Sequence, residues 1–472
     1  MSGCIVGWAH SKFGKHEGRD IESLIVEIAQ AALADAGVTA ADIDTVYLGT
    51  MNGGFVRQEF PASLVFQADP ALCFKPATRV EDACATGSAA IHQGLNAFAA
   101  GRARLALIVE VAQAALADAG VAAADIDTIY LGTMNGGFVR QEFPASLVFQ
   151  ADPALRFKPA TRVEDACATG SAAIHQGLNA IAARRARLAL IIGVEKMTEV
   201  SGAQVGDILL GASYRKEEDA IEGGFAGIFG KIAQSYFQRY GDQSDALARI
   251  AAKNHKNGVA NPLAQMQKDL GYEFCRTVSD KNPIVAGPLK RTDCSLVSDG
   301  AAAVVLADTA TALSLRKAVI FRAAEQVNDF LPMSRRDIVA FEGPELAWKR
   351  ALAAARLGLD DLDLVETHDC FTIAELIEYE AMGLTPRGEG ARAILEGWTE
   401  KDGKLPVNPS GGLKSKGHPI GATGVSMHVL AAMQLTGKAG GMQVPDAALA
   451  GVFNMGGAAV ANFVSILEPL RA

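Results

Sequence analysis

The spacing of apolar residues alternates along the chain between the repeat of a helix and that of a buried strand. In the N-terminal part, this spacing predicts strands over 4–9, 45–49 and 103–108 and helices over 21–36 and 83–100. Such an alternation is typical of an α/β protein in which helices cover a sheet.

The rest of the chain divides into two parts. Residues 201–286 are polar and glycine-rich with little strand pattern, which indicates an inserted region before strands return over 287–308. A helix over 345–355 is expected to close at Gly358. The other predicted elements are strands over 318–323, 362–366, 448–453 and 458–467 and helices over 372–381 and 425–435.

A long internal repeat dominates the first half. Residues 25–107, the first copy, recur 83 positions later as residues 108–190, the second copy. Near-identity indicates a recent tandem duplication or an assembly error, with a functional two-site array as the alternative. Removing one copy leaves 389 residues. The six differing pairs are Ile28/Val111, Thr39/Ala122, Val46/Ile129, Cys73/Arg156, Phe98/Ile181 and Gly101/Arg184.

The junctions distinguish the copies. The second copy continues through the apolar stretch 188–192 into new sequence, whereas the first copy runs into residues 109–113, in the middle of a helix pattern. If the first copy formed the core, the chain would be interrupted just before the strand over 188–192; if the second did, it would be interrupted near residues 24–26, inside the first helix. Because the first interruption would be more harmful, we expect the second copy to form the core. The first copy would then pack on the surface, exchange with another subunit or stay poorly ordered.

Composition narrows the classes of function. A net charge of −9 argues against a broad nucleic-acid surface but leaves room for a small basic pocket. The seven cysteines form no CxxC pair. The sequence also has no signal peptide and no apolar run long enough to span a bilayer, about 18 residues. We therefore expect a cytoplasmic protein with no membrane partner.

The motif Asp-Ala-Cys-Ala-Thr-Gly-Ser occurs at 82–88 and again at 165–171. Cys84 and Cys167 therefore each start a predicted helix, where the positive end of the helix dipole favours a thiolate. Backbone N–H groups at such a position can stabilise an oxyanion. The alternative is a small buried apolar cysteine. The motif makes these residues candidate nucleophiles.

A glycine-rich run over 408–424 holds His418 directly before a helix. An imidazole in this position can take a proton from a thiol. The glycines would let a ligand approach the backbone, and Lys414 and Lys416 would meet phosphates. The alternative is a solvated loop with a structural histidine.

Two further segments carry candidate groups. His368 and Cys370 follow a predicted strand, where open α/β sheets place their sites, although a core cysteine is the alternative. Gly456 lies between two apolar strands, where a backbone N–H can reach a ligand or form a plain turn. Similar glycine-rich helix starts at 167–171 and 421–426 suggest two similar halves with the site between them. The Cys and His spacings do not match zinc ligand pairs, so no metal is expected.

Together these four segments resemble the thiolase superfamily over nearly the whole chain, and 389 residues is the length of one thiolase subunit. The resemblance implies an α/β fold of five layers, α-β-α-β-α, with two similar halves that contain mixed sheets. The implied division is an N-terminal half over 1–205, a loop domain that covers coenzyme A over 206–286, a return strand over 287–312 and a C-terminal half over 313–472.

The chain departs from the usual thiolase pattern at two places. His368-Asp-Cys370-Phe stands where most thiolases have Asn-Glu-Ala-Phe, and Asn454-Met-Gly456 stands where they have Cys-x-Gly. This pattern resembles the sterol-carrier-protein type of thiolase. The alternatives are a β-ketoacyl synthase, which does not need the second thiol, an aldolase-like relative that works with a small OB-fold partner, and a catalytically impaired duplicate that binds coenzyme A.

The resemblance also implies roles for the candidate residues. Cys167, or Cys84 in the other copy, would be the nucleophile of an acyl-CoA acyltransferase, and Cys370 its general acid and base. His418 would activate the nucleophile and, with His368, polarise the thioester oxygen. The N–H of Gly456 would hold an oxyanion. The implied substrate-binding set is Gly411, Gly412, Lys414, Pro419 and Gly421.

The implied partners are coenzyme A and acyl-CoA, which are substrates, so no resident cofactor is expected. A homodimer or homotetramer is the expected assembly.

Overall fold

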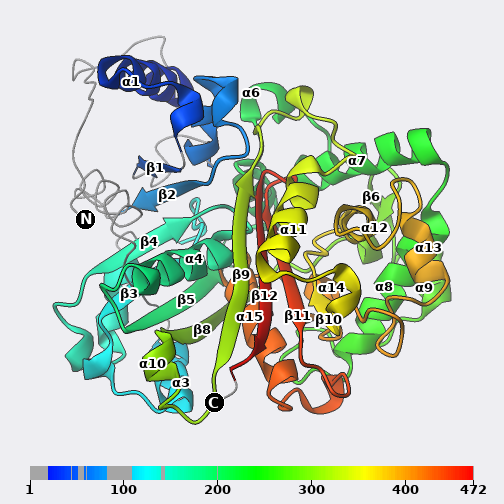
Figure 1. The fold of residues 1–472 in the computed structure, drawn as a ribbon. Coiled ribbons are helices and arrows are strands. Elements are labelled where there is room, and N and C mark those ends of the chain that lie inside the picture. Colours follow the sequence, from blue (N-terminus) through cyan, green and yellow to red (C-terminus); the bar gives the residue numbers. More distant parts are fainter. Residues whose placement is uncertain are drawn as a thin grey trace.

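A computed structural model describes residues 20–43, 45–50, 58–59, 61–81, 109–139, 144–198 and 200–470. Its strands form a six-stranded sheet, a four-stranded sheet and a small hairpin (Figure 1). Cys84 and the expected elements over 4–9, 83–100 and 103–108 lie outside the described residues.

The six-stranded sheet has the order β1-β2-β4-β3-β5-β8. Within each copy two strands pair in parallel, β1 with β2 and β3 with β4, and β3 also pairs in parallel with β5. The pairs β2/β4 and β5/β8 are antiparallel, so the sheet is mixed. Its strands are β1 (Val46–Gly49), β2 (Ala77–Glu81), β3 (Thr128–Gly132), β4 (Ala160–Glu164), β5 (Leu188–Lys196) and β8 (Asp299–Ala307).

The four-stranded sheet has the order β10-β11-β12-β9 and is also mixed. β10 pairs in parallel with β11, while β12 runs antiparallel to both of its neighbours. Its strands are β9 (Val319–Asn328), β10 (Leu364–Glu366), β11 (Ala450–Gly456) and β12 (Ala461–Pro469).

Helices complete five layers around these two sheets. α4 (Thr169–Ala182) and α15 (Ile420–Leu435) lie between the sheets and contact each other, while α3 (Val109–Ala119) covers the outer face of the first sheet and α11 (Glu342–Ala355) that of the second. α4 and α15 cross closely because a Cβ on Gly424 would come within 2.3 Å of the Ser171 nitrogen. The expected α-β-α-β-α arrangement is confirmed.

The glycine-rich middle region is mostly helical, although its sequence predicted little regular structure beyond an insertion. Its large helices lie on the right in Figure 1, beside α12 (Thr372–Ala381). α8 packs through buried alanines. The many glycines of the region hid this helical pattern in the sequence. The region holds α5 (Gly202–Leu210), α6 (Arg215–Glu218), α7 (Gly224–Tyr240), α8 (Ser244–Gly258), α9 (Tyr272–Arg276) and the hairpin of β6 (Ile284–Ala286) and β7 (Leu289–Lys290).

Several boundaries differ from the sequence-based expectation. α11 begins at Glu342, and it ends when Arg356 adopts a left-handed conformation with φ 57°, not at Gly358. α15 begins at Ile420, five residues earlier than expected. The glycines in its first turns made the predicted helix begin too late. The same glycines allow the close contact between α15 and α4 described above. Within the described part of the chain, no helix is long and apolar enough to cross a membrane.

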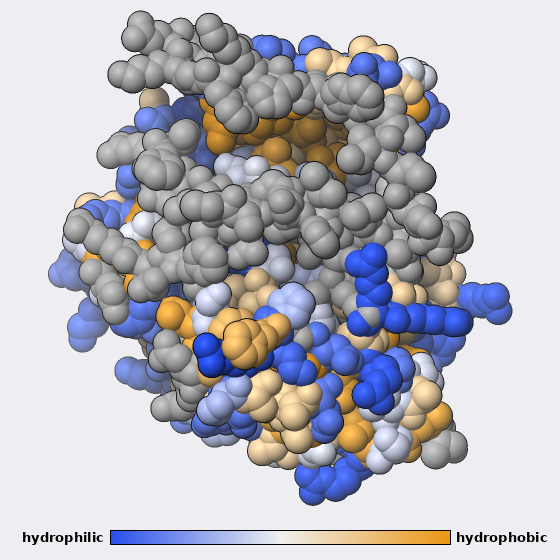
Figure 2. Space-filling view, turned by 90° about the vertical axis from the view of Figure 1, so that its left-hand side faces the viewer, coloured by the Kyte–Doolittle hydropathy of each residue, from blue (hydrophilic) through white to orange (hydrophobic). Residues whose placement is uncertain are grey.

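The first copy lies at the upper left of Figure 1, where α1 (Ile21–Ala36) packs on the 3-10 segment Pro61–Gln67, which in turn contacts β1 and β2. α1 ends at Gly37 in a left-handed conformation with φ 68°, as a glycine permits. On the face drawn in Figure 2, hydrophobic residues line a hollow at the height of the first copy. The buried cluster of the first copy contains Ala40, Ala62, Val65, Phe66, Leu72 and Ala77.

Candidate active site

Cys167 lies in the tight turn between β4 and α4. Ala166, directly before it, has φ 50°, a left-handed conformation that costs energy for a residue with a Cβ. Two hydrogen bonds hold the turn: the Asp165 N–H donates to Thr169 Oγ1 (2.8 Å) and the Ala166 N–H to Glu164 Oε1 (2.5 Å). The strained turn places the Cys167 side chain, 4% exposed, at the start of a helix.

Cys167, His368 and His418 meet between the two halves of the molecule. The sulfur and one ring nitrogen of each histidine lie within 4.8 Å of one another, and the two ring centroids are 5.0 Å apart at an interplanar angle of 80°. His368 comes from the loop between β10 and α12, and His418 from the residue pair that precedes α15. The structure thus brings together three of the side chains that the sequence singled out.

The hydrogen bonds of His418 define its tautomer. The Thr423 hydroxyl donates to the Pro419 carbonyl oxygen (3.1 Å), so its oxygen is free to accept from His418 Nδ1–H (2.7 Å). A neutral His418 therefore presents an unprotonated Nε2, and this buried atom has no partner among the described residues. His418 is arranged to accept a proton from the neighbouring thiol.

His368 has the opposite tautomer, set by Asn454. The Asn454 amide nitrogen donates to the Cys167 carbonyl oxygen (3.1 Å), which can only accept, and to His368 Nδ1 (2.8 Å). Ser171 Oγ donates to the amide oxygen of Asn454 (2.8 Å). A neutral His368 therefore carries its proton on Nε2, another buried atom without a described partner. It is arranged to donate a hydrogen bond to an oxyanion.

Burial sets the resting charge of these groups. It raises the pKa of the Cys167 thiol to about 12, an effect that the Gly457 backbone N–H partly offsets. Burial lowers the pKa of His418 to about 3, helped by Lys416, and holds the pKa of His368 well below its usual value. Near neutral pH the site therefore rests as a thiol beside two neutral imidazoles.

Cys370 lies close enough to Cys167 for the two sulfurs to interact electrostatically. Burial raises the pKa of Cys370 well above its usual value, and the negative charge of a Cys167 thiolate would raise it further. Asp369 ties this loop to the glycine-rich run, because its carboxylate accepts the N–H groups of Leu413 (2.6 Å) and Lys414 (3.2 Å). Cys370 therefore lies in the same loop as His368, with its thiol within the electrostatic influence of Cys167.

The end of β11 supplies backbone to the site. Gly456 is the last residue of β11 and lies next to Gly457, whose φ of 62° favours glycine and where a Cβ would come within 2.9 Å of the Ala212 carbonyl oxygen. The Gly457 N–H points at the Cys167 sulfur. The sequence singled out Gly456 as the donor, and the structure adds its neighbour.

The residues expected to bind substrate lie around the site, but three of them, all glycines, are needed for close packing between chain segments. A Cβ on Gly411 would meet the Gly258 backbone at 2.6 Å, and one on Gly412 would meet the Asp369 carboxylate at 2.3 Å. A Cβ on Gly421 would come within 2.3 Å of the Val194 carbonyl oxygen. These three glycines allow close packing between chain segments.

Two other members of this set have distinct positions. Pro419 precedes α15 with φ −69° and accepts the Thr423 hydroxyl that orients His418. Lys414 differs from the expectation: it is 1% exposed, and its ammonium donates to the Cys294 carbonyl oxygen inside the protein. Its ammonium does not lie at the surface, where we expected it to meet phosphates.

Sequence reasoning missed several side chains that support the site. Glu195 at the end of β5 accepts hydrogen bonds from Thr133 Oγ1 (2.9 Å) and from the N–H of Gly421 (3.2 Å), which ties the loop after β3 to the start of α15. Burial raises its pKa to about 7. Ser171 and Thr423 were missed because hydroxyl groups are common in helices, and only the fold shows what they contact.

Among the described residues, one group of three has donor atoms arranged as they would be around a metal ion: Cys167, His368 and His418. Ligands of tetrahedral zinc lie about 3.5 Å from one another, so these atoms, spread over up to 4.8 Å, would have to move closer together. The opposite tautomers of the two histidines already account for the cluster as a nucleophile, a base and a donor. The absence of a resident metal stays a prediction.

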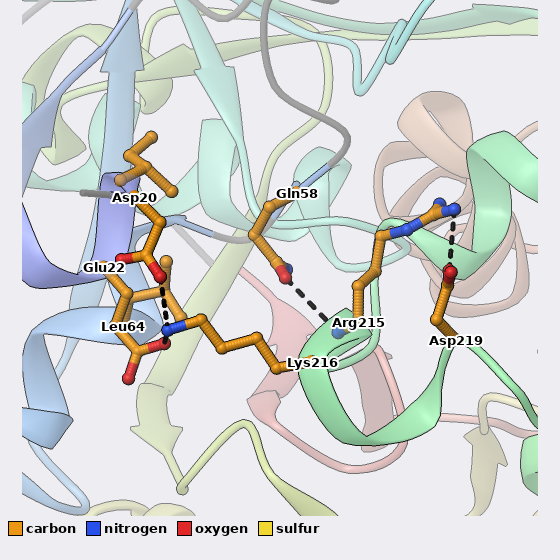
Figure 3. Close-up of a pocket in the computed structure, with 8 residues that line it drawn as sticks. Asp20, Glu22, Gln58, Leu64, Arg215, Lys216 and Asp219 are labelled. Atoms are coloured by element: carbon orange, nitrogen blue, oxygen red, sulfur yellow. Dashed lines mark hydrogen bonds and ion pairs between the residues drawn. The ribbon is translucent and has the colours of Figure 1, made fainter. Parts of the chain in front are cut away.

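An open cavity of about 300 Å³ lies apart from these residues (Figure 3). Its walls come from residues 20–22 at the start of α1, from the first copy and from the segment around α6, and none of the site residues lines it. It is lined by Asp20, Ile21, Glu22, Gln58, Leu64, Arg215, Lys216 and Asp219.

Comparison with known families agrees with the geometry. The thiolase N-terminal domain matches twice, over residues 4–111 and 104–272, and a thiolase C-terminal domain-like family matches residues 324–469. The double match reflects the internal repeat. Together these matches span most of the chain.

Individual relatives point to the same family. An acetyl-CoA acetyltransferase of Methanothermobacter thermautotrophicus is 38% identical over 356 residues, 74% of this chain and 91% of the relative. Human sterol carrier protein 2 is 33% identical over 74% of this chain and 65% of its own length.

Solved structures show the same fold at low identity. The Ltp2–ChsH2(DUF35) aldolase is similar with a TM-score of 0.65 at 22% identity, over 77% of this chain and 93% of that chain. Human mitochondrial 3-ketoacyl-CoA thiolase in complex with CoA has a TM-score of 0.58 at 17% identity, over 77% and 91%. With the fold, the family matches and these relatives taken together, the chain belongs to the thiolase family.

Proposed function

We propose that this thiolase-family acyltransferase makes or breaks a carbon–carbon bond next to a thioester through an acyl-enzyme on Cys167. In one direction it splits 3-oxoacyl-CoA with coenzyme A, and in the other it condenses two acyl-CoA units. The observation that carries the proposal is the cluster of Cys167 with the two neutral histidines His368 and His418, with the second thiol, Cys370, in the same loop as His368 and electrostatically coupled to Cys167.

The first half of thiolysis forms the acyl-enzyme. His418 Nε2 takes the Cys167 proton as the sulfur attacks the 3-oxo carbon. The Cα–Cβ bond of the substrate then breaks, and acetyl-CoA leaves as an enolate whose oxygen accepts from His368 Nε2–H. Cys370 gives its proton to the enolate carbon and becomes a thiolate.

The second half restores the enzyme. The Cys370 thiolate takes the proton of the incoming coenzyme A thiol, whose sulfur attacks the acyl group on Cys167. Acyl-CoA leaves, and the Cys167 sulfur recovers its proton from His418. The N–H groups of Cys167 and Gly456 would hold the oxyanion of each tetrahedral intermediate, and one such donor contributes about 3 kcal/mol.

We infer that residues 206–286 form the cover over coenzyme A and that the halves are divided as expected from the sequence. α8, in this region, packs on the glycine-rich run that leads to His418, through the close contact of Gly258 with Gly411. A cover attached to the catalytic loop in this way would couple binding of coenzyme A to the position of His418.

The test is to trap the acyl-enzyme. The protein would be incubated with acetoacetyl-CoA, quenched in acid, digested with trypsin and analysed for acetylated cysteine. The two active-site peptides differ in mass, because the one over 163–184 carries Ile181 and the one over 80–102 carries Phe98. We expect acetyl on the Ile181 peptide.

The other outcomes are equally informative. Acetyl on the Phe98 peptide would keep the chemistry but move the nucleophile to Cys84. If neither peptide is labelled and no free coenzyme A is consumed or released, the proposed reaction is wrong or the duplicated chain is inactive. Repeating the assay on a single-copy variant separates these two cases.

An aldolase-like reaction is the second candidate, because the Ltp2–ChsH2(DUF35) aldolase has a similar fold. Such a reaction gives an aldehyde or ketone and an acyl-CoA enolate, so it still needs a proton donor to the enolate but forms no acyl-enzyme on Cys167. A Cys167→Ala variant that keeps turnover of a 3-hydroxyacyl-CoA, while the parent does not cleave acetoacetyl-CoA, would favour the aldolase.

A further inference from the structure

The two copies contact each other through the same strand. β2 of the first copy and β4 of the second have identical sequences, and they pair antiparallel in the middle of the six-stranded sheet. The register pairs Arg79 with Glu164, Val80 with Val163 and Glu81 with Arg162. Because Val163 is the counterpart of Val80, a local two-fold axis passes between these two valines.

The charges follow the same symmetry. Arg79 Nη1 lies 3.4 Å from Glu164 Oε2, and Arg162 Nη1 lies 2.7 Å from Glu81 Oε2. All four side chains are almost completely buried. In other words, each arginine contacts the glutamate of the other copy, and the two contacts are related by the two-fold axis. This is the type of contact that joins the two subunits of a symmetric dimer.

The symmetry extends beyond the paired strands. Where both copies are described, they have the same order of elements and the same parallel strand pair. Matching side chains make matching bonds: Arg79 Nε donates to the Thr50 carbonyl oxygen and Arg162 Nε to that of Thr133, both at 3.1 Å. The first copy thus sits beside the second as a rotated duplicate of the same unit.

The first copy also contacts parts of the chain beyond the second copy. The Arg215 N–H donates to Gln58 Oε1 at 3.3 Å (Figure 3), and the Phe74 N–H donates to the Asn328 carbonyl oxygen at 2.6 Å. Directly before the copy, Lys216 Nζ lies 2.7 Å from carboxylate oxygens of both Asp20 and Glu22. The contacts of Gln58 and Phe74 place the first copy on a surface that reaches beyond the second copy.

The edge of β4 also lies next to the candidate nucleophile. Glu164, which pairs with Arg79, uses its other oxygen to accept the N–H of Ala166 in the strained turn before Cys167. The neighbouring copy therefore contributes to the support of this turn.

We propose that the first copy occupies, within one chain, the sheet edge on which a second subunit would sit in a single-copy protein. The exposed edge of β4 in such a protein would pair with β4 of another copy in the same register, with Arg162 of each chain against Glu164 of the other. In the full chain this edge is covered, so no second chain joins through it.

The test compares the full chain with a variant that lacks residues 25–107. Leu24 and Leu107 are the same residue type, so this deletion joins Leu24 to Ile108 and leaves the helix sequence continuous. We add Val163→Cys, because opposed residues on antiparallel strands lie about 4.5–5.5 Å apart at Cα, within reach of a disulfide. Under mild oxidation, the single-copy V163C variant should run as a covalent dimer on a non-reducing gel.

The full chain provides the control. The same V163C substitution in the full chain should give no covalent dimer, because Val80 occupies the opposing position. The full-chain double variant V80C/V163C should form a disulfide within one chain, detected as one linked pair of tryptic peptides at monomer mass. This last result tests the register even if the deleted variant does not fold.

Three results would overturn the proposal. One is a folded single-copy variant that stays monomeric by light scattering at high concentration and does not cross-link. The second is a covalent dimer of the full-chain V163C variant. The third is the absence of an intrachain disulfide in V80C/V163C. None of these measurements depends on catalysis, so they stand apart from the proposed acyl transfer.

Discussion

The first and second copies have almost the same sequence and, where both are described, the same local structure, but they differ in burial. All five residues of β3 are buried, whereas β1 has three half-buried residues and one exposed residue. The reason is their neighbours: β3 lies between β4 and β5, while β1 is the edge strand of the sheet. The comparison shows that the sequence of a copy determines its local fold, and that the rest of the chain decides whether it becomes core.

The neighbours of each copy also decide which one can be completed as an active site. In the second copy, the strand–turn–helix unit of β4 and α4 meets His368, His418 and Asn454 from the C-terminal half. Those three residues occur once in the chain, so one copy at most can be completed by them. The catalytic roles of the copies are therefore expected to be unequal.

The largest expected difference between the copies is at the two counterpart cysteines. Cys167→Ala should lower kcat by roughly 10⁴-fold or more, because the acyl-enzyme can no longer form, and steady-state thiolysis of acetoacetyl-CoA measures this. Cys84→Ala, the matched control, should leave kcat within about twofold. Equal losses in the two variants would show that both copies react.

A second expected difference concerns the pH dependence of alkylation. With a thiol pKa of about 12 and a His418 pKa of about 3, no thiolate–imidazolium pair exists near neutral pH. The rate of iodoacetamide labelling on the Ile181 peptide should rise about tenfold per pH unit from pH 6 to pH 9. A small-molecule thiol in the same tube would begin to level off near its pKa. A plateau for Cys167 below pH 8 would contradict the neutral resting state.

Core substitutions test the difference in burial directly. Leu131 in β3 is completely buried, whereas its counterpart Leu48 in β1 is half-buried. Leu131→Ala should lower the free energy of unfolding by about 3 kcal/mol, and Leu48→Ala by about 1 kcal/mol. Urea unfolding followed by circular dichroism measures both. Similar losses would mean that the first copy is packed as tightly as the second.

The smallest expected effect is on the hydrogen bond that orients Asn454. Ser171→Ala removes the donor to Asn454 Oδ1, which should loosen His368 and lower kcat about tenfold, equivalent to about 1.4 kcal/mol. The counterpart Ser88→Ala serves as the control and should have no effect on kcat. An unchanged kcat in Ser171→Ala would show that Asn454 is held by its other contacts.

Much of the fold could be predicted because local patterns agreed with the tertiary structure. The helix predicted over 21–36 is α1, and the one over 372–381 is α12. Both have a regular apolar face. The predicted boundaries were less accurate where glycines interrupt the pattern, as at the start of α15.

The candidate site could be predicted only as a set of residue types. Cys167, His368, Cys370 and His418 stand in recognisable motifs, and the fold brings them together. The tautomers of the histidines depend on Asn454 and Thr423, and the Asn454 contacts join residues that are far apart in the sequence. The burial of Lys414 and the pairing of β2 with β4 likewise depend on tertiary contacts that no local pattern encodes.

Because the two copies belong to one chain, the pairing between them does not depend on protein concentration. Two subunits that pair through β4 separate when their concentration falls below the dissociation constant. In this chain β2 is tethered to β4, so its effective concentration is set by the intervening segment and does not change with the amount of protein. The pairing of β2 with β4 should therefore persist at any dilution, and it would be lost only by unfolding.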